Sequence, residues 1–246
     1  MSTLPIQFGT RFFLLALECK SMKSTGLATD WREVDRFDGG VGWLAYPEEE
    51  IQRASHGLVA DGEVWLVDPV DADGIDAMLA EYGTVAGVVL LLGRHERDCA
   101  KFANRHGVSV WVPDFLSGVE SEIDAPVERF RYELGDSGYV AHNLVDHRFW
   151  QEALLYNEDT GVLVVADAVG TAEYFRTNDE VLGVHPFLRL TPPKVLARLE
   201  PSRILVGHGP GIHENAPVAL KTAVEGARRG MPRLLLQTLK RTVFGN

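Results

Sequence analysis

The chain has 246 residues, of which 46% are hydrophobic and 24% are charged, and its formal net charge is −11. This composition is typical of a globular protein, and α/β chains of this length often form a single domain. The acidic balance argues against a general nucleic-acid surface, because phosphate binding needs clustered cations. We therefore expect no nucleic-acid partner.

The cysteine content and the hydropathy pattern bear on the compartment. Cys19 and Cys99 are the only two cysteines, and they lie far apart in the sequence. They build neither a disulfide framework nor a cysteine zinc site, so a reducing cytoplasm is the expected location. Residues 12–17 are apolar but are followed at once by Glu18 and lack a cleavage site. No apolar run approaches the ~20 residues of a membrane helix, so no membrane partner is expected, and a homo-oligomer is left open.

The two ends of the chain differ from its middle. Residues 1–40 are interpreted as an N-terminal extension, with Met22 as an alternative start because strong periodic patterns begin only after it. Residues 41–246 are interpreted as one domain that ends in a basic helix. Residues 216–246 carry a net charge of +5, and we expect this segment to dock on the acidic body or to aid solubility rather than to bind an anionic partner.

Strands and helices alternate from residue 41 onward. The Asp61-Gly62 pair is typical of a hairpin turn between two strands. Residues 85–92 form a nearly continuous apolar run, which is typical of a strand buried on both faces. In the first half, strands are predicted at residues 41–46, 54–60, 63–68, 85–92 and 108–112, and helices at 73–81 and 97–106.

The second half continues the same alternation after an irregular stretch at residues 114–126. A long mixed loop is predicted at residues 169–190, and His185 is expected in a turn of that loop. Strands are predicted at residues 127–134, 148–156, 162–166 and 203–206, and helices at 192–199 and at 216–243, the last one kinked or broken near Gly230 and Pro232.

Polar residues follow three of the predicted buried strands. Strand 85–92 runs into residues 93–98, strand 162–166 ends at Asp167, and strand 203–206 runs into Gly207 and His208. Ligands of α/β sheets gather beyond the carboxyl ends of strands. A residue at such an end also has the rigid support that a metal ligand needs. Taken alone, Asp167 is equally consistent with the cap of a turn.

The order of these features resembles the metallo-β-lactamase superfamily over roughly residues 41–213. In that superfamily an apolar strand ends in His-x-His-x-Asp-His, and a third His, a strand-ending Asp and a final Gly-His follow. Here residues 163–167 resemble the Asp-ended strand, and residues 204–209 resemble the Gly-His strand. The resemblance implies an α/β fold of the four-layer αββα sandwich type and a metal-dependent hydrolase.

The metal motif itself is degenerate. Laid on the four positions of the superfamily's motif, this chain has Gly93, His95, Arg97 and Asp98, so only His95 is kept. For the third His, His147 stands at a plausible distance and His142 is the alternative. A place in a solvated turn remains an equally open interpretation of both histidines.

The resemblance therefore implies a depleted site for one divalent metal ion, Zn, Mn or Fe, or for none. Arg97 cannot be a ligand, because a guanidinium keeps its proton. We expect Arg97 either to polarise a substrate oxygen, as a catalytic residue beside Asp98, or to pair with Asp98 or Asp167 in place of the metal. The candidate metal ligands are His95, Asp98, His147, Asp167 and His208.

Two functions remain open from the sequence. The first is a mononuclear hydrolase of a small ester or thioester, in which a metal-bound water supplies the nucleophile. The second is a metal-free, catalytically silent protein with this fold that binds a small molecule or a protein partner.

Overall fold

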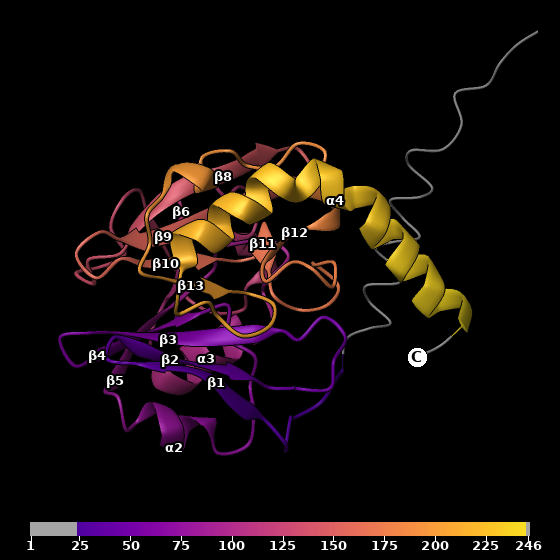
Figure 1. Ribbon diagram of the computed structural model, residues 1–246. Helices are drawn as coiled ribbons and strands as arrows, with labels where there is room; N and C mark the ends of the chain where they lie inside the picture. Colours follow the sequence, from indigo (N-terminus) through magenta and orange to yellow (C-terminus); the bar gives the residue numbers. More distant parts are fainter. Residues whose placement is uncertain (1–23, 245–246) are drawn as a thin grey trace, which may run out of the picture.

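Two β-sheets face each other in the computed structural model, which describes residues 24–244, and helices cover their outer faces (Figure 1). The seven-stranded sheet has the order β1-β2-β3-β4-β5-β6-β7. Its strands are β1 (Arg32–Phe37), β2 (Gly40–Leu44), β3 (Ala54–Ala60), β4 (Glu63–Val67), β5 (Thr84–Val89), β6 (Val110–Pro113) and β7 (Val127–Phe130). Strands β1 to β4 are antiparallel neighbours, and β4 to β7 are parallel.

The second sheet has four strands in the order β13-β10-β9-β8. They are β8 (Val140–His147), β9 (Trp150–Asn157), β10 (Val162–Val165) and β13 (Arg203–Val206). Strands β10 and β13 run parallel, so their carboxyl ends lie side by side. A separate two-stranded ladder joins β11 (Val169–Gly170) to β12 (Gly183–Val184).

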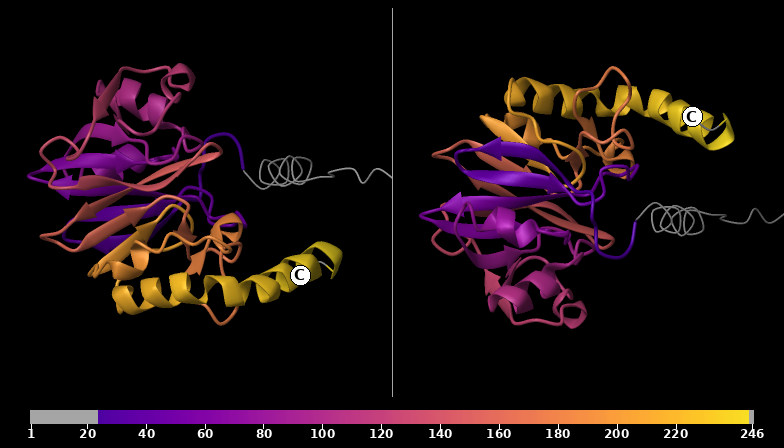
Figure 2. Two further views of the ribbon diagram at one scale, coloured as in Figure 1. Left: turned by 90° about the horizontal axis from the view of Figure 1, so that it is seen from above. Right: turned by 90° about the horizontal axis from the view of Figure 1, so that it is seen from below.

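The helices complete the layers. Helices α2 (Ile75–Leu79) and α3 (Cys99–His106) lie on the seven-stranded sheet, and α4 (Ala216–Phe244) crosses the four-stranded sheet and extends past it (Figure 2). Residues 24–244 also contain three short 3-10 helices, η1 (Glu120–Glu122), η2 (Pro186–Leu188) and η3 (Leu196–Arg198). The four-layer αββα sandwich expected from the resemblance is confirmed. None of the helices in residues 24–244 combines the length and the apolar character that a bilayer crossing requires.

Strand alternation explains how one apolar run serves two cores. Val88 of β5 and Leu90 just beyond it pack with Phe102 of α3, whereas Val89 and Leu91 pack between the sheets. Successive side chains of a strand point to opposite faces, so a strand buried on both faces needs apolar residues at every position. This is the pattern that predicted β5. The hairpin at Asp61-Gly62 is also confirmed, with both residues at positive φ.

Some boundaries differ from the sequence-based expectations. The sheet begins before residue 41, because β1 pairs with β2 along its length. Strand β8 was not predicted, since its exposed edge carries polar residues that hide the alternation. The predicted loop at residues 169–190 contains β11, β12 and η2, and the predicted helix at 192–199 is only η3. Helix α4 is continuous across Gly230 and Pro232, so it is not broken there, but its axis changes direction about midway along its length, in agreement with the expected kink (Figure 1). The expected early start at Met22 falls outside the described residues.

Candidate metal centre

Three of the five candidate ligands meet at the carboxyl ends of strands from both sheets. His95 follows β5, Asp167 follows β10 and His208 follows β13. All three side chains are buried, and one ligand atom from each lies within 4.8 Å of the other two. The apolar strands before them fix the positions of these side chains. The structure thus brings together Asp167 and His208, which the strand-end pattern singled out, and His95, which the resemblance singled out within the loop at residues 93–98.

The hydrogen bonds of the two histidines set the direction of their lone pairs. His95 Nδ1 lies 3.0 Å from Asp68 Oδ2, and His208 Nδ1 lies 2.6 Å from the carbonyl oxygen of Ile51. A carbonyl oxygen and a carboxylate oxygen only accept, so each Nδ1 carries the proton. In the neutral rings Nε2 is then an unprotonated acceptor. Burial lowers the pKa of His208, which favours its neutral form.

Asp167 places a carboxylate oxygen between these two ring nitrogens. Its Oδ1 lies 3.0 Å from His95 Nε2 and 2.8 Å from His208 Nε2, yet it makes no aligned hydrogen bond. Burial raises the pKa of Asp167, but the charge of either imidazole, when protonated, outweighs burial and holds that pKa well below its ordinary value. The carboxylate is therefore ionised. With both rings neutral, three acceptor atoms converge here without a donor, and this arrangement needs a cation, either a metal ion or a proton on one ring.

Two side chains, Arg94 and Glu152, fix the position of Asp167 through hydrogen bonds. Arg94 donates to Asp167 Oδ2 from one Nη at 2.9 Å and more weakly from Nε at 3.3 Å. The buried Glu152 accepts hydrogen bonds from the backbone N–H groups of Asp167 and Ala168, both at 2.8 Å, and one from Trp150 Nε1. Burial, followed by the charge of Asp167, raises the pKa of Glu152 to about 7. Together these contacts fix the backbone and one carboxylate oxygen of Asp167, and they leave Oδ1 facing the histidines.

Arg97 does not take the role that the sequence suggested. It pairs with neither Asp98 nor Asp167, and instead its guanidinium donates to three backbone carbonyls, those of Ala54, Asp68 and Gly207. Ala54 and Asp68 belong to the seven-stranded sheet and its edge, whereas Gly207 follows β13 of the other sheet. Arg97 is therefore a clamp between the sheets. Three of its five N–H donors are committed to these carbonyls, so its main contacts are with the backbone of the two sheets and not with the carboxylates of the cluster.

Asp98 and the later histidines lie away from the cluster. Asp98 precedes α3, and its Oδ2 accepts from the backbone N–H of Asp71, so its carboxylate is turned toward that loop. His147 is exposed at the end of β8 beside Phe149, and His142 is exposed on the same strand. The expectation that Asp98 and a β8 histidine join the ligands is not met. Their spacing along the chain was plausible, but the direction of each side chain is set by tertiary contacts that spacing does not encode.

His185 reaches the cluster from the loop in which it was expected to occupy a turn. It lines one cavity with His95, Asp167 and His208 and packs edge-on against Trp150, with ring centres 4.6 Å apart. Its Nδ1 accepts the backbone N–H of Phe187 and so caps η2. Burial lowers the pKa of His185 to about 3, which keeps the ring neutral. The flanking apolar residues at 182–188 were the only sequence signal for its burial.

Comparisons with solved structures assign the fold. A metallo-β-lactamase named DIM-1 matches with a TM-score of 0.59 and 13% identity, over 80% of this chain and 98% of the other. One from Pontibacter korlensis matches with a TM-score of 0.58 and 11% identity, over 80% and 99%. VMB-1 matches with a TM-score of 0.57 and 10% identity, over 85% and 100%. No family model matches the sequence, and no curated protein does. The chain therefore has the metallo-β-lactamase fold.

Proposed function

We propose that this protein is a mononuclear metal-dependent hydrolase whose ion is held by His95, Asp167 and His208. The observation that carries the proposal is the convergence of two imidazole Nε2 atoms on Asp167 Oδ1, a buried oxygen without an aligned hydrogen-bond partner among the described residues. Ligand atoms of one four-coordinate ion with bonds of about 2.0–2.2 Å lie roughly 3–3.5 Å apart, close to the contacts found here. A cation relieves the repulsion among these atoms.

The donor set fits several divalent ions. Two neutral imidazoles and one carboxylate suit Zn²⁺, Mn²⁺ or Fe²⁺ and leave coordination positions for water and substrate. When bound, such an ion supplies a water-derived nucleophile near neutral pH and polarises a carbonyl oxygen. A small ester or thioester is the substrate class that this chemistry serves.

The residues around the ligands hold the set in place and limit it to one ion. Asp68 and the Ile51 carbonyl orient the two rings through Nδ1. Such outer contacts fix the tautomer of a ligating histidine. Arg97 lines the same cavity with its permanent positive charge. A second dication beside a guanidinium would be repelled in this largely buried place.

Two further side chains are placed to act on a substrate. Arg94 reaches the cavity from its exposed side, so its guanidinium is available to a carbonyl or carboxylate oxygen next to the ligands. His185 presents a neutral ring whose Nδ1 is already engaged. In that neutral ring the proton is on Nε2, which can donate a hydrogen bond to a substrate or leaving-group oxygen. Arg94 thereby takes the electrostatic role that the sequence had suggested for Arg97.

One observation favours the alternative, a metal-free binding protein. The ion pair between Arg94 and Asp167 supplies positive charge to the cluster from the chain itself. If that charge and a proton on one imidazole suffice, the cluster needs no metal ion. Metal content therefore separates the two functions.

The test measures bound metal in protein purified without a chelator or a histidine tag. We expect close to one Zn, Mn or Fe per chain by mass spectrometry, and its loss in Asp167→Ala and in His208→Ala. His142→Ala and His147→Ala are matched controls and should keep the metal. Chelation should also lower the melting temperature, because the ion binds the native state. Metal-free wild-type protein whose melting is indifferent to chelator would refute the proposal.

A further inference from the structure

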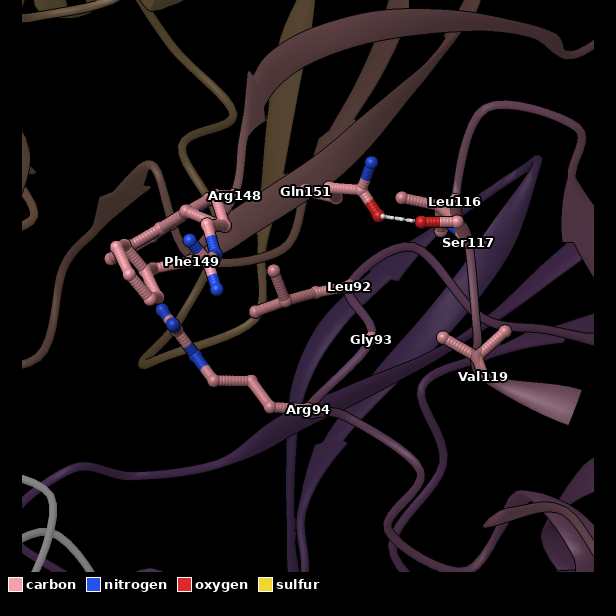
Figure 3. Close-up of a pocket in the computed structure, with 10 residues that line it drawn as sticks. Leu92, Gly93, Arg94, Leu116, Ser117, Val119, Arg148, Phe149 and Gln151 are labelled. Carbon is pink, nitrogen blue, oxygen red and sulfur yellow. Dashed lines mark hydrogen bonds between the residues drawn. The ribbon is translucent and has the colours of Figure 1, made fainter. Parts of the chain in front are cut away.

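A second cavity lies next to the candidate metal centre on the exposed side of Arg94 (Figure 3). It has a volume of about 190 Å³. Its walls come from three segments, the start of the loop after β5, residues 116–119 after β6, and the turn between β8 and β9. Leu92, Leu116 and Val119 make part of the wall apolar. The cavity is therefore large enough for a small organic group.

The charge of this cavity is opposite to that of the chain. Arg94 and Arg148 line it, and no aspartate or glutamate does, although the whole chain carries −11. Figure 3 draws the two arginines and Phe149 on one side of the cavity, across from Ser117 and Val119. Arg148 is exposed, and no carboxylate among the described residues pairs with it. Arg94 is already paired with Asp167, so Arg148 carries the positive charge that no carboxylate in residues 24–244 balances. A wall with two guanidinium groups, one of them without such a carboxylate partner, attracts an anion.

The other polar groups of the cavity are already satisfied by one another. Gln151 Oε1 accepts from the Ser117 hydroxyl at 2.8 Å and from the Ser117 backbone N–H at 3.0 Å. Gln151 Nε2 donates to Asp146 and to the carbonyl of Phe115. Ser117 and Gln151 thus line the cavity, but their polar groups are already hydrogen-bonded within the protein. Recognition of a polar ligand falls to the guanidinium groups.

Arg94 connects this cavity with the metal centre. It lines both cavities, and its guanidinium stacks on the Trp150 ring with 3.8 Å between its Cζ and the ring centre. The bonds to Asp167 use Nε and one Nη, which leaves the other Nη for a second oxygen. Stacking holds the planar fork in one orientation, as bidentate recognition of an oxyanion requires. An anion bound here would be separated from the candidate metal ligands only by the guanidinium of Arg94.

Gly93 makes room for the ligand. At this position the superfamily's motif has its first histidine, and here a Cβ would already approach Val119 Cγ1 to 3.1 Å. A histidine side chain would occupy the space that Gly93 leaves in the cavity wall. The substitution that removes a metal ligand therefore also opens the cavity.

We propose that this cavity binds the oxyanion group, a carboxylate or phosphate, of a small substrate with an apolar body, between Arg94 and Arg148. Its role as part of the substrate site rests on the proposed hydrolase function, whereas the anion binding itself does not. The bound anion would place the scissile bond of the substrate toward the cluster of His95, Asp167 and His208.

The test is calorimetric titration of the full chain with benzoate, phenyl phosphate and the neutral analogue benzamide. We expect one of the anions to bind at least about tenfold more tightly than benzamide, and high salt to weaken it. Arg148→Met should weaken the anion about tenfold and leave benzamide and metal content unchanged. Arg229→Met, an exposed arginine on α4, is the matched control and should bind as the wild type does.

Three results would overturn the proposal: no anion binding up to about 10 mM, equal binding of benzoate and benzamide, or unchanged anion binding in Arg148→Met. Metal analysis of the same preparations keeps this inference separate from the proposed function. Anion binding that depends on Arg148 in metal-free protein would refute the hydrolase and leave the anion site standing. Protein that holds a metal ion but does not prefer the anions over benzamide would refute the anion site and leave the proposed hydrolase standing.

Discussion

Replacement of Arg97 by methionine tests whether the guanidinium clamps the two sheets. Methionine keeps most of the side-chain length and removes the donors to the carbonyls of Ala54, Asp68 and Gly207. A hydrogen bond to a charged group contributes about 1.5–3 kcal/mol, and a buried group left without a partner costs about 1–3 kcal/mol. The Gly207 carbonyl also accepts from Ala54 N, so it keeps one partner. Burial of the guanidinium, whose Nε has no partner, offsets part of the sum.

The expected loss is therefore about 3 kcal/mol, a substantial part of the 5–15 kcal/mol that holds a typical protein folded. Urea unfolding measures it as a lower midpoint at unchanged slope, and thermal unfolding should shift by roughly 6–12 °C for a chain of this size. Arg131→Met, which removes an exposed arginine just after the end of β7, is the control. A loss below about 0.5 kcal/mol, the usual range of surface substitutions, would refute the clamp.

Three further outcomes follow from the contacts of the histidines and of Gly93. Asp68→Asn should weaken metal affinity about 10–100-fold, because Asp68 holds the His95 ring in place through Nδ1. Asp76→Asn is the control, because Asp76 contacts His106, which is not a candidate ligand, and it should keep the wild-type affinity. Equal metal affinities of the two variants in a titration would contradict the role given to Asp68. Gly93→Ala should weaken benzoate binding and leave metal content unchanged, because the added methyl group narrows only the anion cavity. Calorimetric titration with benzoate and metal analysis of the same variant test the two parts of this prediction. Burial lowers the pKa of His56, so the unfolded chain takes up a proton below about pH 6.5 that the folded chain refuses. The free energy of unfolding should then fall with decreasing pH by up to about 1.4 kcal/mol per pH unit. The urea midpoint of His56→Gln should fall less steeply than that of the wild type between pH 7 and pH 5. Equal pH dependence of the two midpoints would contradict this prediction.

The sequence was sufficient for the parts of the fold and site that depend on local pattern. Strand-end positions identified Asp167 and His208, because a buried apolar run followed by a polar residue is visible in one dimension. The same pattern gave only the loop at residues 93–98, and His95 was chosen within it by its position in the superfamily's motif. Strand β8 was missed because it lies at the edge of its sheet with half of its residues exposed, so its hydrophobic signal is weak.

The rest of the site depends on directions that spacing does not contain. Asp98 sits three residues from His95, yet the turn into α3 aims its carboxylate at the Asp71 backbone. Arg94 and Arg97 are the same residue type in the same loop, and only tertiary contacts distinguish them: Arg97 has a positive φ and three carbonyl partners, whereas Arg94 contacts Asp167. The sequence alone could not tell which of the two faces the cluster. Glu152 was overlooked because its function is to hold backbone N–H groups that are far from it in sequence.

The carbonyl clamp of Arg97 bears on how the strand ends of the two sheets are held together. In a two-metal site the ions themselves tie neighbouring strand ends together, so the loss of one ligand loosens the framework. Here the guanidinium of Arg97, a cation that belongs to the chain, joins strand ends of both sheets through its hydrogen bonds. The ends of the strands are then held in register by the chain itself. If the protein holds the metal ion that we propose, removal of that ion would leave this contact between the two sheets intact.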